Sequence, residues 1–333
     1  MIKFYKLMFF NSLIIGTLIS VCSYSWMIMW IGMEINLLSI IPMIMTKNIY
    51  SNESGMKYFI VQSMASTMFI FSVIMLEKSL SLSFQYLENL MFTVLQSSLL
   101  MKLGMAPFYS WFPEVIEGLT WMNCILMLTW QKIAPMVILM LTLKLTVILT
   151  ISIIISALMS SILGLNQMSL RKILSYSSIN HMAWMLLSMF SFSSIWVIYF
   201  VIYSSSNLLL MSYFSYFKIF FINQLNLLTK KYDKWMILFN FISLSGLPPL
   251  IGFFPKWLTI SYSVIFNNYI ITLILIMSSL VSMYFYMRIT FSSLILITNQ
   301  PKMKNFHVLK INLLLYLVNF IFILSLPIMN LAL

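Results

Sequence analysis

Long apolar runs divide the chain into segments separated by short polar stretches. An apolar run of about 20 residues predicts a membrane-spanning helix, because a helix of that length crosses the hydrocarbon core of a bilayer. We predict about eleven such helices, at residues 4–22, 25–46, 57–76, 86–118, 121–143, 146–165, 172–191, 194–217, 235–266, 268–292 and 311–331. The pattern therefore predicts an all-α polytopic membrane protein.

Two of these segments carry helix-breaking residues in the same arrangement. Residues 104–113 read GMAPFYSWFP and residues 246–255 read GLPPLIGFFP. Pro107 in the first motif, and Pro248 and Pro249 in the second, each remove a helical hydrogen bond, and Gly104 and Gly246 permit a turn. Backbone that is exposed to lipid cannot be left without hydrogen bonds. We therefore predict two broken helices, 86–118 and 235–266, whose breaks are buried or line a water cavity.

The two breaks occupy matching places in the order of helices. One lies in the fourth of the first five predicted helices, and the other lies in the fourth of the next five. An odd number of helices per unit inverts the second unit relative to the first, and paired breaks in inverted repeats point to a transport site. We predict one bundle at 1–143, a second at 144–295, and a loop with a C-terminal transmembrane helix at 296–333.

The basic residues test this topology. Sorted by alternate loops, one side of the membrane receives only Lys78 and Lys144. The other side receives Lys3, Lys6, Lys47, Lys57, Arg171, Lys172, Lys218, Lys230, Lys231, Lys234, Lys302, Lys304 and Lys310, with Arg288 nearby. Basic loops stay on the matrix or cytoplasmic side of a membrane. We therefore expect the N-terminus on that side and the C-terminus on the opposite side.

Composition supports the membrane class and narrows the chemistry. The 333 residues are 62% hydrophobic and only 8% charged, whereas a soluble chain is about 25% charged. The net charge of +12 mostly reflects the basic loops on one side of the membrane. No basic patch interleaves with aromatic residues as in a nucleic-acid-binding surface. The polar segment 225–235 suits anionic phospholipid headgroups. Cys22 and Cys124 lie in apolar runs, and neither Cys-x-x-Cys nor Gly-x-Gly-x-x-Gly occurs, so nothing suggests an iron–sulfur or dinucleotide site.

A few ionisable residues remain inside the predicted helices: Glu34, Lys102, Lys132, His181 and Lys256. A charged side chain at a helix centre costs about 2.5–3.5 kcal/mol on insertion scales, and such residues mark ion or proton pathways. Histidine titrates near neutral pH and can relay protons. No Ser/His/Asp triad and no metal-ligand spacing competes with this interpretation. We predict a proton pathway along these five residues.

Structural roles remain open for several of them. Glu34 could form a structural ion pair with a lysine, and Lys102 could extend its amine to the membrane surface. Lys256 could be an interfacial anchor beside Trp257. His181 could simply form a hydrogen bond in the core. Each of these roles predicts a residue without a part in transport.

Five blocks of sequence carry a resemblance to a known family. They are WIGMEINLLSIIP (30–42), LLMKLGMAPFYSWFPEVIEGLTW (99–121), LTWQKIAP (128–135), LNQMSLRKILSYSSINHMAW (165–184) and SLSGLPPLIGFFPKW (243–257). The chain resembles the subunit 2 family of the proton-pumping NADH:ubiquinone oxidoreductase, respiratory complex I, whose members are similar to Mrp-type cation/proton antiporters. The resemblance spans nearly the whole chain, and the blocks follow the family's order.

The resemblance implies two inverted five-helix bundles, each with a half-channel for protons. It maps the family's key carboxylate onto Glu34, its lysines onto Lys102, Lys132 and Lys256, and its relay histidine onto His181. Many relatives carry a further histidine where this chain has Tyr109, so that role is not transferred.

The resemblance also implies a setting. It places the chain in the mitochondrial inner membrane, with the N-terminus in the matrix, the C-terminus in the intermembrane space, and other membrane-arm subunits as partners, especially antiporter-like ones. It implies no redox site here, because NADH, FMN, iron–sulfur clusters and ubiquinone belong to other subunits. Two alternatives remain: a stand-alone cation/proton antiporter and a purely structural membrane-arm subunit.

Overall fold

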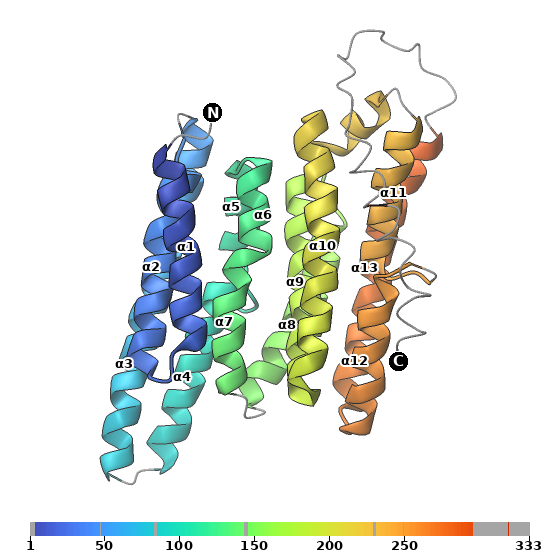
Figure 1. Ribbon diagram of the computed structural model, residues 1–333. Coiled ribbons are helices and arrows are strands. Elements are labelled where there is room, and N and C mark those ends of the chain that lie inside the picture. Colours follow the sequence, from blue (N-terminus) through green and yellow to red (C-terminus); the bar gives the residue numbers. More distant parts are fainter. Residues whose placement is uncertain are drawn as a thin grey trace. The chain divides into compact units, whose positions relative to one another are not determined.

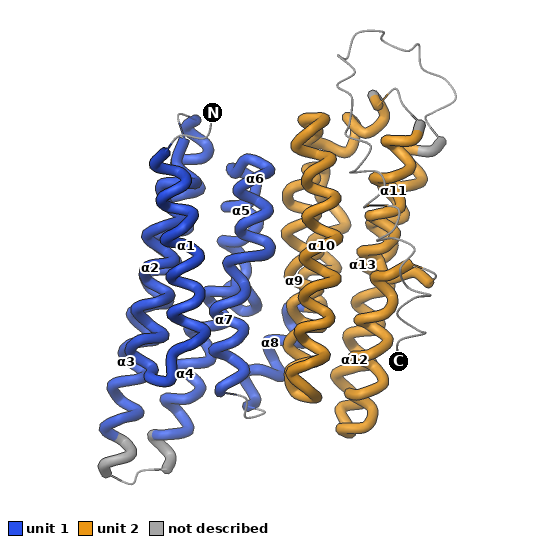
Figure 2. The backbone as a smooth tube through the Cα atoms, in the orientation of Figure 1, with its two compact units in different colours: residues 1–156 blue, residues 157–333 orange. Residues whose placement is uncertain are grey.

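The computed structural model describes residues 4–46, 48–82, 85–142, 146–228, 231–248, 250–295 and 319, and these residues fold into helices joined by short connections (Figure 1). Residues 1–156 and residues 157–333 form two compact units, and the division falls inside one helix (Figure 2). Each unit buries its own core. Each is described separately below.

Unit 1 holds seven complete helices and the start of an eighth in its described residues. These are α1 (Phe4–Cys22), α2 (Trp26–Ile44), α3 (Ile49–Leu82), α4 (Gln85–Leu103), α5 (Trp111–Gly118), α6 (Trp121–Leu128), α7 (Trp130–Leu141) and the first part of α8 (Val147–Gly164). The helix α1 packs against α2, α3 packs against α4, and α4 packs against α7. This packing encloses the polar side chains of α2, α4 and α7.

Unit 2 continues from α8 with α9 (Leu170–Ser191), α10 (Ser193–Phe217), η1 (Ile222–Leu227), α11 (Lys231–Ser245), α12 (Phe253–Ile265) and α13 (Tyr269–Ile295). The helix α9 lies against both α10 and α12, and α11 lies against α13. Nearly all of α9 is buried, including its polar residues Asn180 and His181. This burial makes α9 the central helix of unit 2.

Both motifs interrupt a helix. In unit 1, α4 ends at Leu103 and α5 begins at Trp111; in unit 2, α11 ends at Ser245 and α12 begins at Phe253. Gly104 has a φ of 70° and Gly246 has a φ of 81°. This left-handed conformation is open to glycine and unfavourable for other residues, so the two glycines are required at equivalent turns. Pro249 lies outside the described residues, as does the predicted helix at 311–331 apart from residue 319.

The structure adds an interruption that the apolar pattern did not predict. The segment expected as one helix at 121–143 is divided into α6 and α7, which meet at Thr129. Thr129 Oγ1 donates a hydrogen bond to the Ile125 carbonyl at 2.7 Å. A hydroxyl that bonds back to the preceding turn bends a helix, and apolar periodicity cannot register such a bend because the residues on both sides are equally apolar.

Seven helical segments of the described residues are long and apolar enough to cross a membrane, with α6 and α7 counted together: 4–22, 26–44, 49–78, 121–141, 147–164, 193–217 and 269–293. The second halves of the broken helices are too short to cross alone, with 8 residues in α5 and 13 in α12. The protein is therefore a polytopic helical membrane protein.

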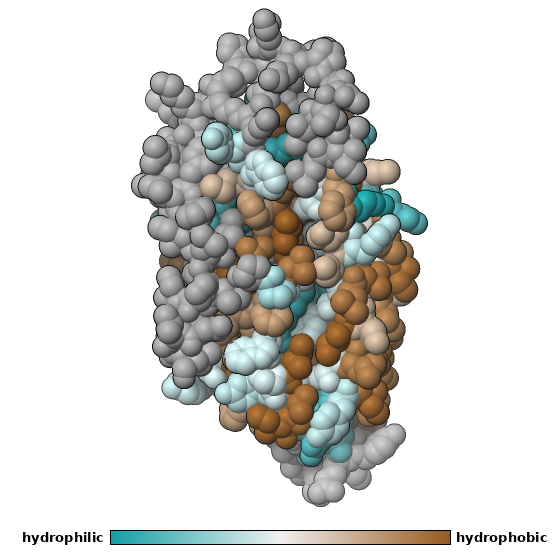
Figure 3. Space-filling view, turned by 90° about the vertical axis from the view of Figure 1, so that its right-hand side faces the viewer, coloured by the Kyte–Doolittle hydropathy of each residue, from teal (hydrophilic) through white to brown (hydrophobic). Residues whose placement is uncertain are grey.

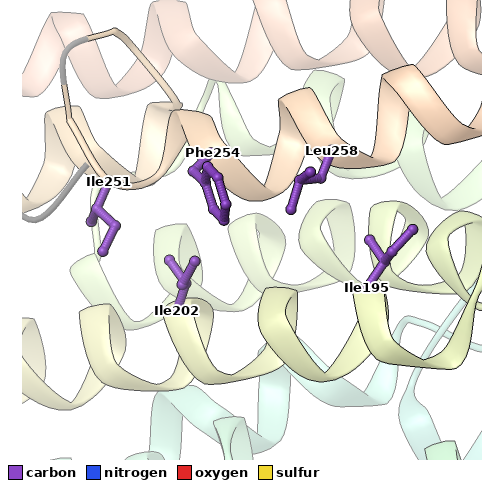
Figure 4. Packing of buried hydrophobic residues seen from close by; sticks show 5 residues of the cluster. All are labelled: Ile195, Ile202, Ile251, Phe254 and Leu258. Atoms are coloured by element: carbon purple, nitrogen blue, oxygen red, sulfur yellow. The ribbon is translucent and has the colours of Figure 1, made fainter. Parts of the chain in front are cut away.

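Hydrophobic packing holds the second break in place. Ile195 and Ile202 of α10 face Ile251, Phe254 and Leu258 of the break and α12 (Figure 4). All five side chains are at most 7% exposed. The backbone turn at the second motif is thus supported by side chains from another helix and is kept away from lipid, as a broken membrane helix requires.

The outer surface of unit 2 is apolar where a lipid or protein neighbour would lie. Hydrophobic side chains cover much of the described surface in the space-filling view, with polar residues between them (Figure 3). On α13, Ile270, Leu273, Met277 and Leu280 are each more than half exposed and recur every three or four residues. This spacing puts the four side chains on one face of the helix. Exposure of such an apolar face is unfavourable in water and favourable in the interior of a membrane.

Candidate functional site

A cavity inside unit 1 brings two of the predicted lysines together. It measures about 30 Å³ and is lined by Lys102 and Leu103 of α4, Gln131 and Lys132 of α7, and residues of α2, α3, α5 and α6. A water molecule needs roughly 10–15 Å³ of such space. The cavity thus admits about two water molecules beside two buried amines.

Lys102 is enclosed at the end of α4, immediately before the break. The side chain is 8% exposed. Its Nζ lies 3.6 Å from Met33 Sδ of α2, and its carbonyl accepts a hydrogen bond from Gln62 Nε2 of α3 at 3.1 Å. Sulfur is a weak acceptor for an amine. Lys102 therefore lies inside the bundle in this structure, away from the membrane surface.

Glu34 lies next to this cavity on α2. It follows Met33, which lines the cavity and whose sulfur lies 3.6 Å from Lys102 Nζ. Its buried Oε1 makes no hydrogen bond to any residue that the structure describes. A buried carboxylate oxygen without a hydrogen bond is costly.

A line of polar side chains crosses the cavity from α2 to α3. Gln131 Nε2 donates to Asn36 Oδ1 at 2.9 Å, and the Tyr58 hydroxyl donates to Gln131 Oε1 at 3.5 Å. Sequence reasoning did not select these residues. Their positions could have indicated them, because Asn36 follows Glu34 by two residues and Gln131 directly precedes Lys132.

Lys132 is 2% exposed and lies in the first turn of α7, directly after the bend at Thr129. Its Nζ is 5.4 Å from the centre of the Phe112 ring. An ammonium at that distance from an aromatic face is attracted to the ring's electron density. Phe112 belongs to α5, so the broken helix supplies Lys102 from one half and the ring beside Lys132 from the other.

In unit 2, His181 is held by tyrosines. His181 Nδ1 and the Tyr199 hydroxyl are hydrogen-bonded at 2.9 Å, and the Tyr203 ring centre lies 5.2 Å from the imidazole ring centre. Both tyrosines project from α10 one helical turn apart, as their spacing of four residues requires. The sequence did not identify this pair, because aromatic residues on an apolar helix look like ordinary core.

Lys256 binds the second break directly. Its Nζ donates a hydrogen bond of 2.8 Å to the carbonyl oxygen of Ser245, the last residue of α11. Pro249, four residues after Ser245 in the sequence, has no N–H that could bond to that carbonyl. The freed backbone oxygen is instead satisfied by the amine of a lysine that is 7% exposed. The chain thus places Lys256 inside unit 2.

The five predicted residues form two groups. Lys102 and Lys132 line the cavity of unit 1, and Glu34 follows the lining residue Met33 on α2. His181 and Lys256 lie on α9 and α12 of unit 2, two helices that pack against each other. Tyr109, at the position where many relatives have a histidine, lies in the connection between α4 and α5. In both units a buried lysine lies within three residues of a helix end at a break.

This fold defines a class of membrane protein: helical bundles in which broken helices carry buried amines. The family model described as "NADH:quinone oxidoreductase/Mrp antiporter, TM" matches residues 23–282. The chain belongs to this family.

Similar proteins make the relationship more particular. The chain is 39% identical over 298 residues to NADH-ubiquinone oxidoreductase chain 2 of Locusta migratoria, covering 89% of this chain and 87% of the relative. It is 41% identical over 292 residues to the same-named chain of Anopheles gambiae, covering 85% of this chain and 84% of the relative.

Solved structures share the fold. A chain in respiratory complex I from Thermus thermophilus with bound aureothin matches with a TM-score of 0.85 and 20% identity, covering 99% of this chain and 78% of that one. A chain of the Mrp complex from Dietzia matches with a TM-score of 0.70 and 12% identity, covering 84% of this chain and 58% of that one.

Proposed function

We propose that the chain is a membrane subunit of the proton-translocating NADH:ubiquinone oxidoreductase, and that the unit 1 cavity is one of its proton-binding sites. Family membership and chain 2 relatives over most of the chain support the first statement. One observation carries the second: a small cavity is lined by both Lys102 and Lys132, and Glu34 directly follows Met33, another lining residue.

The charges in the cavity provide a way to load and release a proton. Burial disfavours the charged form of an amine, and a nearby carboxylate favours it. A movement that changes the separation between Glu34 and Lys102 would therefore change whether Lys102 holds its proton. The hydrogen-bonded groups of Asn36, Gln131 and Tyr58 line a short route past Lys132.

Unit 2 provides the second part of the proposed pathway. We assign relay roles to His181, through its bond with Tyr199, and to Lys256, through its bond with the Ser245 carbonyl. A neutral imidazole has one nitrogen that accepts and one that donates, so it can take up a proton on one side and release another on the opposite side. Lys256 could detach from the carbonyl when it loses its proton.

The setting follows from the relatives' names and from the charge pattern. The subunit spans the mitochondrial inner membrane several times and assembles with other membrane-arm subunits, among them antiporter-like ones, and with phospholipids. We place the N-terminus in the matrix, the C-terminus in the intermembrane space, and eleven spans in two inverted five-helix repeats with a final helix. NADH, FMN, iron–sulfur clusters and ubiquinone act in other subunits. The chain 2 relatives favour this role over a stand-alone exchanger.

The test replaces each cavity lysine in the intact complex. Lys102→Met and Lys132→Met remove the titrating amine and keep the length and apolar volume of the side chain. We expect each variant to assemble and to pump fewer protons per electron than the parent. The measurement is the ratio of protons translocated to NADH oxidised in sealed vesicles.

The matched control is Lys57→Met on α3. Lys57 Nζ forms 3.1 Å ion pairs with Glu53 and Glu114, and its side chain is 43% exposed. Exposed ion pairs contribute little to stability, so we expect full assembly and normal pumping. A normal proton-to-electron ratio in both cavity variants would remove the proposed role of the cavity and support a structural one.

A further inference from the structure

The first break leaves a backbone carbonyl that needs a hydrogen bond from outside the helix. At the end of α4, the Met105 N–H donates to the Leu100 carbonyl at 3.1 Å. The Gly104 N–H donates to the Met101 carbonyl at 3.2 Å. This pair of bonds is the Schellman turn that often ends a helix. It leaves the next carbonyl, that of Lys102, without a backbone donor among the described residues, although a buried helix end requires such a partner.

Gln62 of α3 supplies the donor. Its Nε2 donates to the Lys102 carbonyl at 3.1 Å, and its side chain is 5% exposed and lines the unit 1 cavity. One turn earlier on the same helix, the centre of the Tyr58 ring lies 5.9 Å from that of Trp111, the first residue of α5. Residues four positions apart share a helix face. One face of α3 therefore contacts both halves of the broken helix.

The second break is closed by a group of another kind. The Gly246 N–H donates to the Ser243 carbonyl at 3.0 Å, in the way that the Gly104 N–H does in unit 1. The Ser245 carbonyl accepts its hydrogen bond from Lys256 Nζ at 2.8 Å. An amine can gain or lose a proton, whereas a glutamine amide stays neutral. The bond that closes the first break thus does not depend on the protonation of a lysine.

Gln62 holds the backbone of Lys102, so the amine of this lysine is not needed to close the break. The amine reaches toward α2, where its Nζ lies 3.6 Å from Met33 Sδ at the cavity. Sulfur is a weak acceptor, and the cavity has room for water molecules. The Lys102 amine can therefore exchange its sulfur contact for a water molecule while the first break stays closed.

We propose that Gln62 is a positioning residue for Lys102. Its amide closes the first break from α3 and fixes the place of Lys102 at the cavity, while the lysine amine takes up and releases its proton. The expected effect on pumping rests on the proposed role of Lys102, whereas the closure of the break by Gln62 does not. The closure and the effect on pumping are tested by separate measurements.

The first measurement is hydrogen exchange of the peptide that covers the first break, in the purified intact complex. Gln62→Met removes the donor and keeps the length of the side chain. We expect the backbone N–H groups of Gly104 and Met105 to exchange about fivefold faster, the change that a loss of about 1 kcal/mol gives. An exchange rate equal to that of the parent would overturn the closure.

Two further variants show whether the donor itself matters. Gln62→His keeps a ring N–H at a similar distance from the backbone, and we expect exchange as slow as in the parent. Gln167→Met is the matched control, because Gln167 Nε2 donates to the Leu163 carbonyl at 3.2 Å near the end of α8, outside both breaks. We expect it to leave exchange at the first break unchanged. Fast exchange in either variant would overturn the role of the Gln62 amide.

Assembly keeps the closure testable if Gln62→Met does not fold into the complex. Gln62→His retains a donor for the Lys102 carbonyl, so we expect it to assemble. Assembly of Gln62→His without assembly of Gln62→Met would support the closure. Failure of both variants to assemble would overturn it.

The second measurement is the ratio of protons translocated to NADH oxidised in sealed vesicles. We expect Gln62→Met to lower this ratio at normal subunit content, and Gln167→Met to leave it at the parental value. A residue that acts through another has no effect once the other is removed, so the two changes are not additive. Gln62→Met should therefore cause no further loss in a Lys102→Met background. A further loss as large as that in the single variant would overturn the positioning role.

The outcomes separate the role of Gln62 from the lysine mechanism. Normal pumping in Lys102→Met with fast exchange in Gln62→Met would refute the lysine mechanism and keep the closure of the break. Reduced pumping in Lys102→Met with parental exchange and parental pumping in Gln62→Met would keep the lysine mechanism and refute the role of Gln62. Fast exchange with parental pumping in Gln62→Met would refute the positioning role.

Discussion

At the scale of residues, the buried ionisable groups differ in how they are held. Lys256 has a strong acceptor, the Ser245 carbonyl at 2.8 Å, whereas Lys102 has the thioether of Met33 at 3.6 Å. A hydrogen bond from an ammonium to oxygen is far stronger than one to sulfur. Lys102 is therefore held more weakly than Lys256, which is bonded to the backbone.

Tyr199→Phe tests the hold on His181. The variant removes a hydroxyl that is hydrogen-bonded to His181 Nδ1 inside unit 2. We expect it to destabilise unit 2 by about 0.5–1.5 kcal/mol, the net value of one such bond, and to reduce proton pumping. The measurements are the temperature at which the purified complex loses NADH:ubiquinone activity, and the proton-to-electron ratio.

Tyr284→Phe is the control for that prediction. Tyr284 lies on α13 and is 63% exposed. The same loss of a hydroxyl should leave both readings unchanged. If Tyr199→Phe behaves like Tyr284→Phe in both measurements, the hydrogen bond to the His181 imidazole has no role in stabilising unit 2 or in relaying protons.

At the scale of elements, the broken helices are defined by their glycines as much as by their prolines. A Cβ on Gly104 would lie 2.9 Å from Phe112 Cβ, and a Cβ on Gly246 would lie 2.9 Å from Lys256 Cδ. Phe112 is the ring beside Lys132, and Lys256 caps the second break. Each glycine thus gives space to the group that links its break to a buried amine.

Gly104→Ala and Gly246→Ala are expected to damage both breaks. A left-handed conformation costs a non-glycine residue about 1–2 kcal/mol, and the new methyl group would also displace Phe112 or Lys256. We expect lower pumping at normal subunit content, measured as the proton-to-electron ratio and by immunoblot of the assembled complex.

Gly55→Ala provides the comparison. Gly55 lies within α3, and its added Cβ would meet only flexible side-chain atoms, the nearest being Ile44 Cγ2 at 3.3 Å. Alanine favours a helix over glycine by roughly 0.5–1 kcal/mol, so pumping should be unchanged. Normal pumping in both break variants would mean that the exact turn geometry has no part in transport.

At the scale of the whole molecule, polar groups gather inside a mostly hydrophobic core, and the outer surface is apolar as well. The cavity and the hydrogen-bonded groups lie within the bundles, and the exposed stripe of α13 is hydrophobic. The apolar surface follows from the solvent: lipid accepts apolar side chains and rejects unpaired polar groups. The loops then decide how the molecule is oriented.

Cysteine labelling tests the topology in unit 2. Asn223 lies in η1, between α10 and α11, and Asn267 lies between α12 and α13; both are exposed. In our topology the two loops face opposite sides of the membrane. In a Cys22→Ser background, Asn223→Cys should react with an impermeant thiol reagent from the matrix side, and Asn267→Cys from the intermembrane-space side.

The two variants control each other, because both replace an exposed asparagine. Labelling of both from the same side would contradict the predicted topology, since it requires an even number of crossings between the two loops. If each variant were labelled from the side opposite to that predicted, the number of membrane crossings between the two loops would still be odd. The orientation of the chain in the membrane would then be inverted.

The sequence by itself determined the membrane class, several of the long apolar helices and the positions of the two breaks. These features depend on local properties: apolar runs of bilayer length, prolines that lack an N–H, and glycines that tolerate a positive φ. It also selected Glu34, Lys102, Lys132, His181 and Lys256, because a charge in an apolar run is visible without any structure. Motif spacing then identified the family.

Only the tertiary structure decided which groups meet. The cavity that joins Lys102 to Lys132, the approach of Phe112, and the hydrogen bond from Lys256 to Ser245 all connect residues on different helices. Gln96 gained its meaning in the same way, because its amide reaches the Thr142 carbonyl only when α4 packs against α7. Local pattern fixes the face of a helix, whereas packing between helices decides what that face touches.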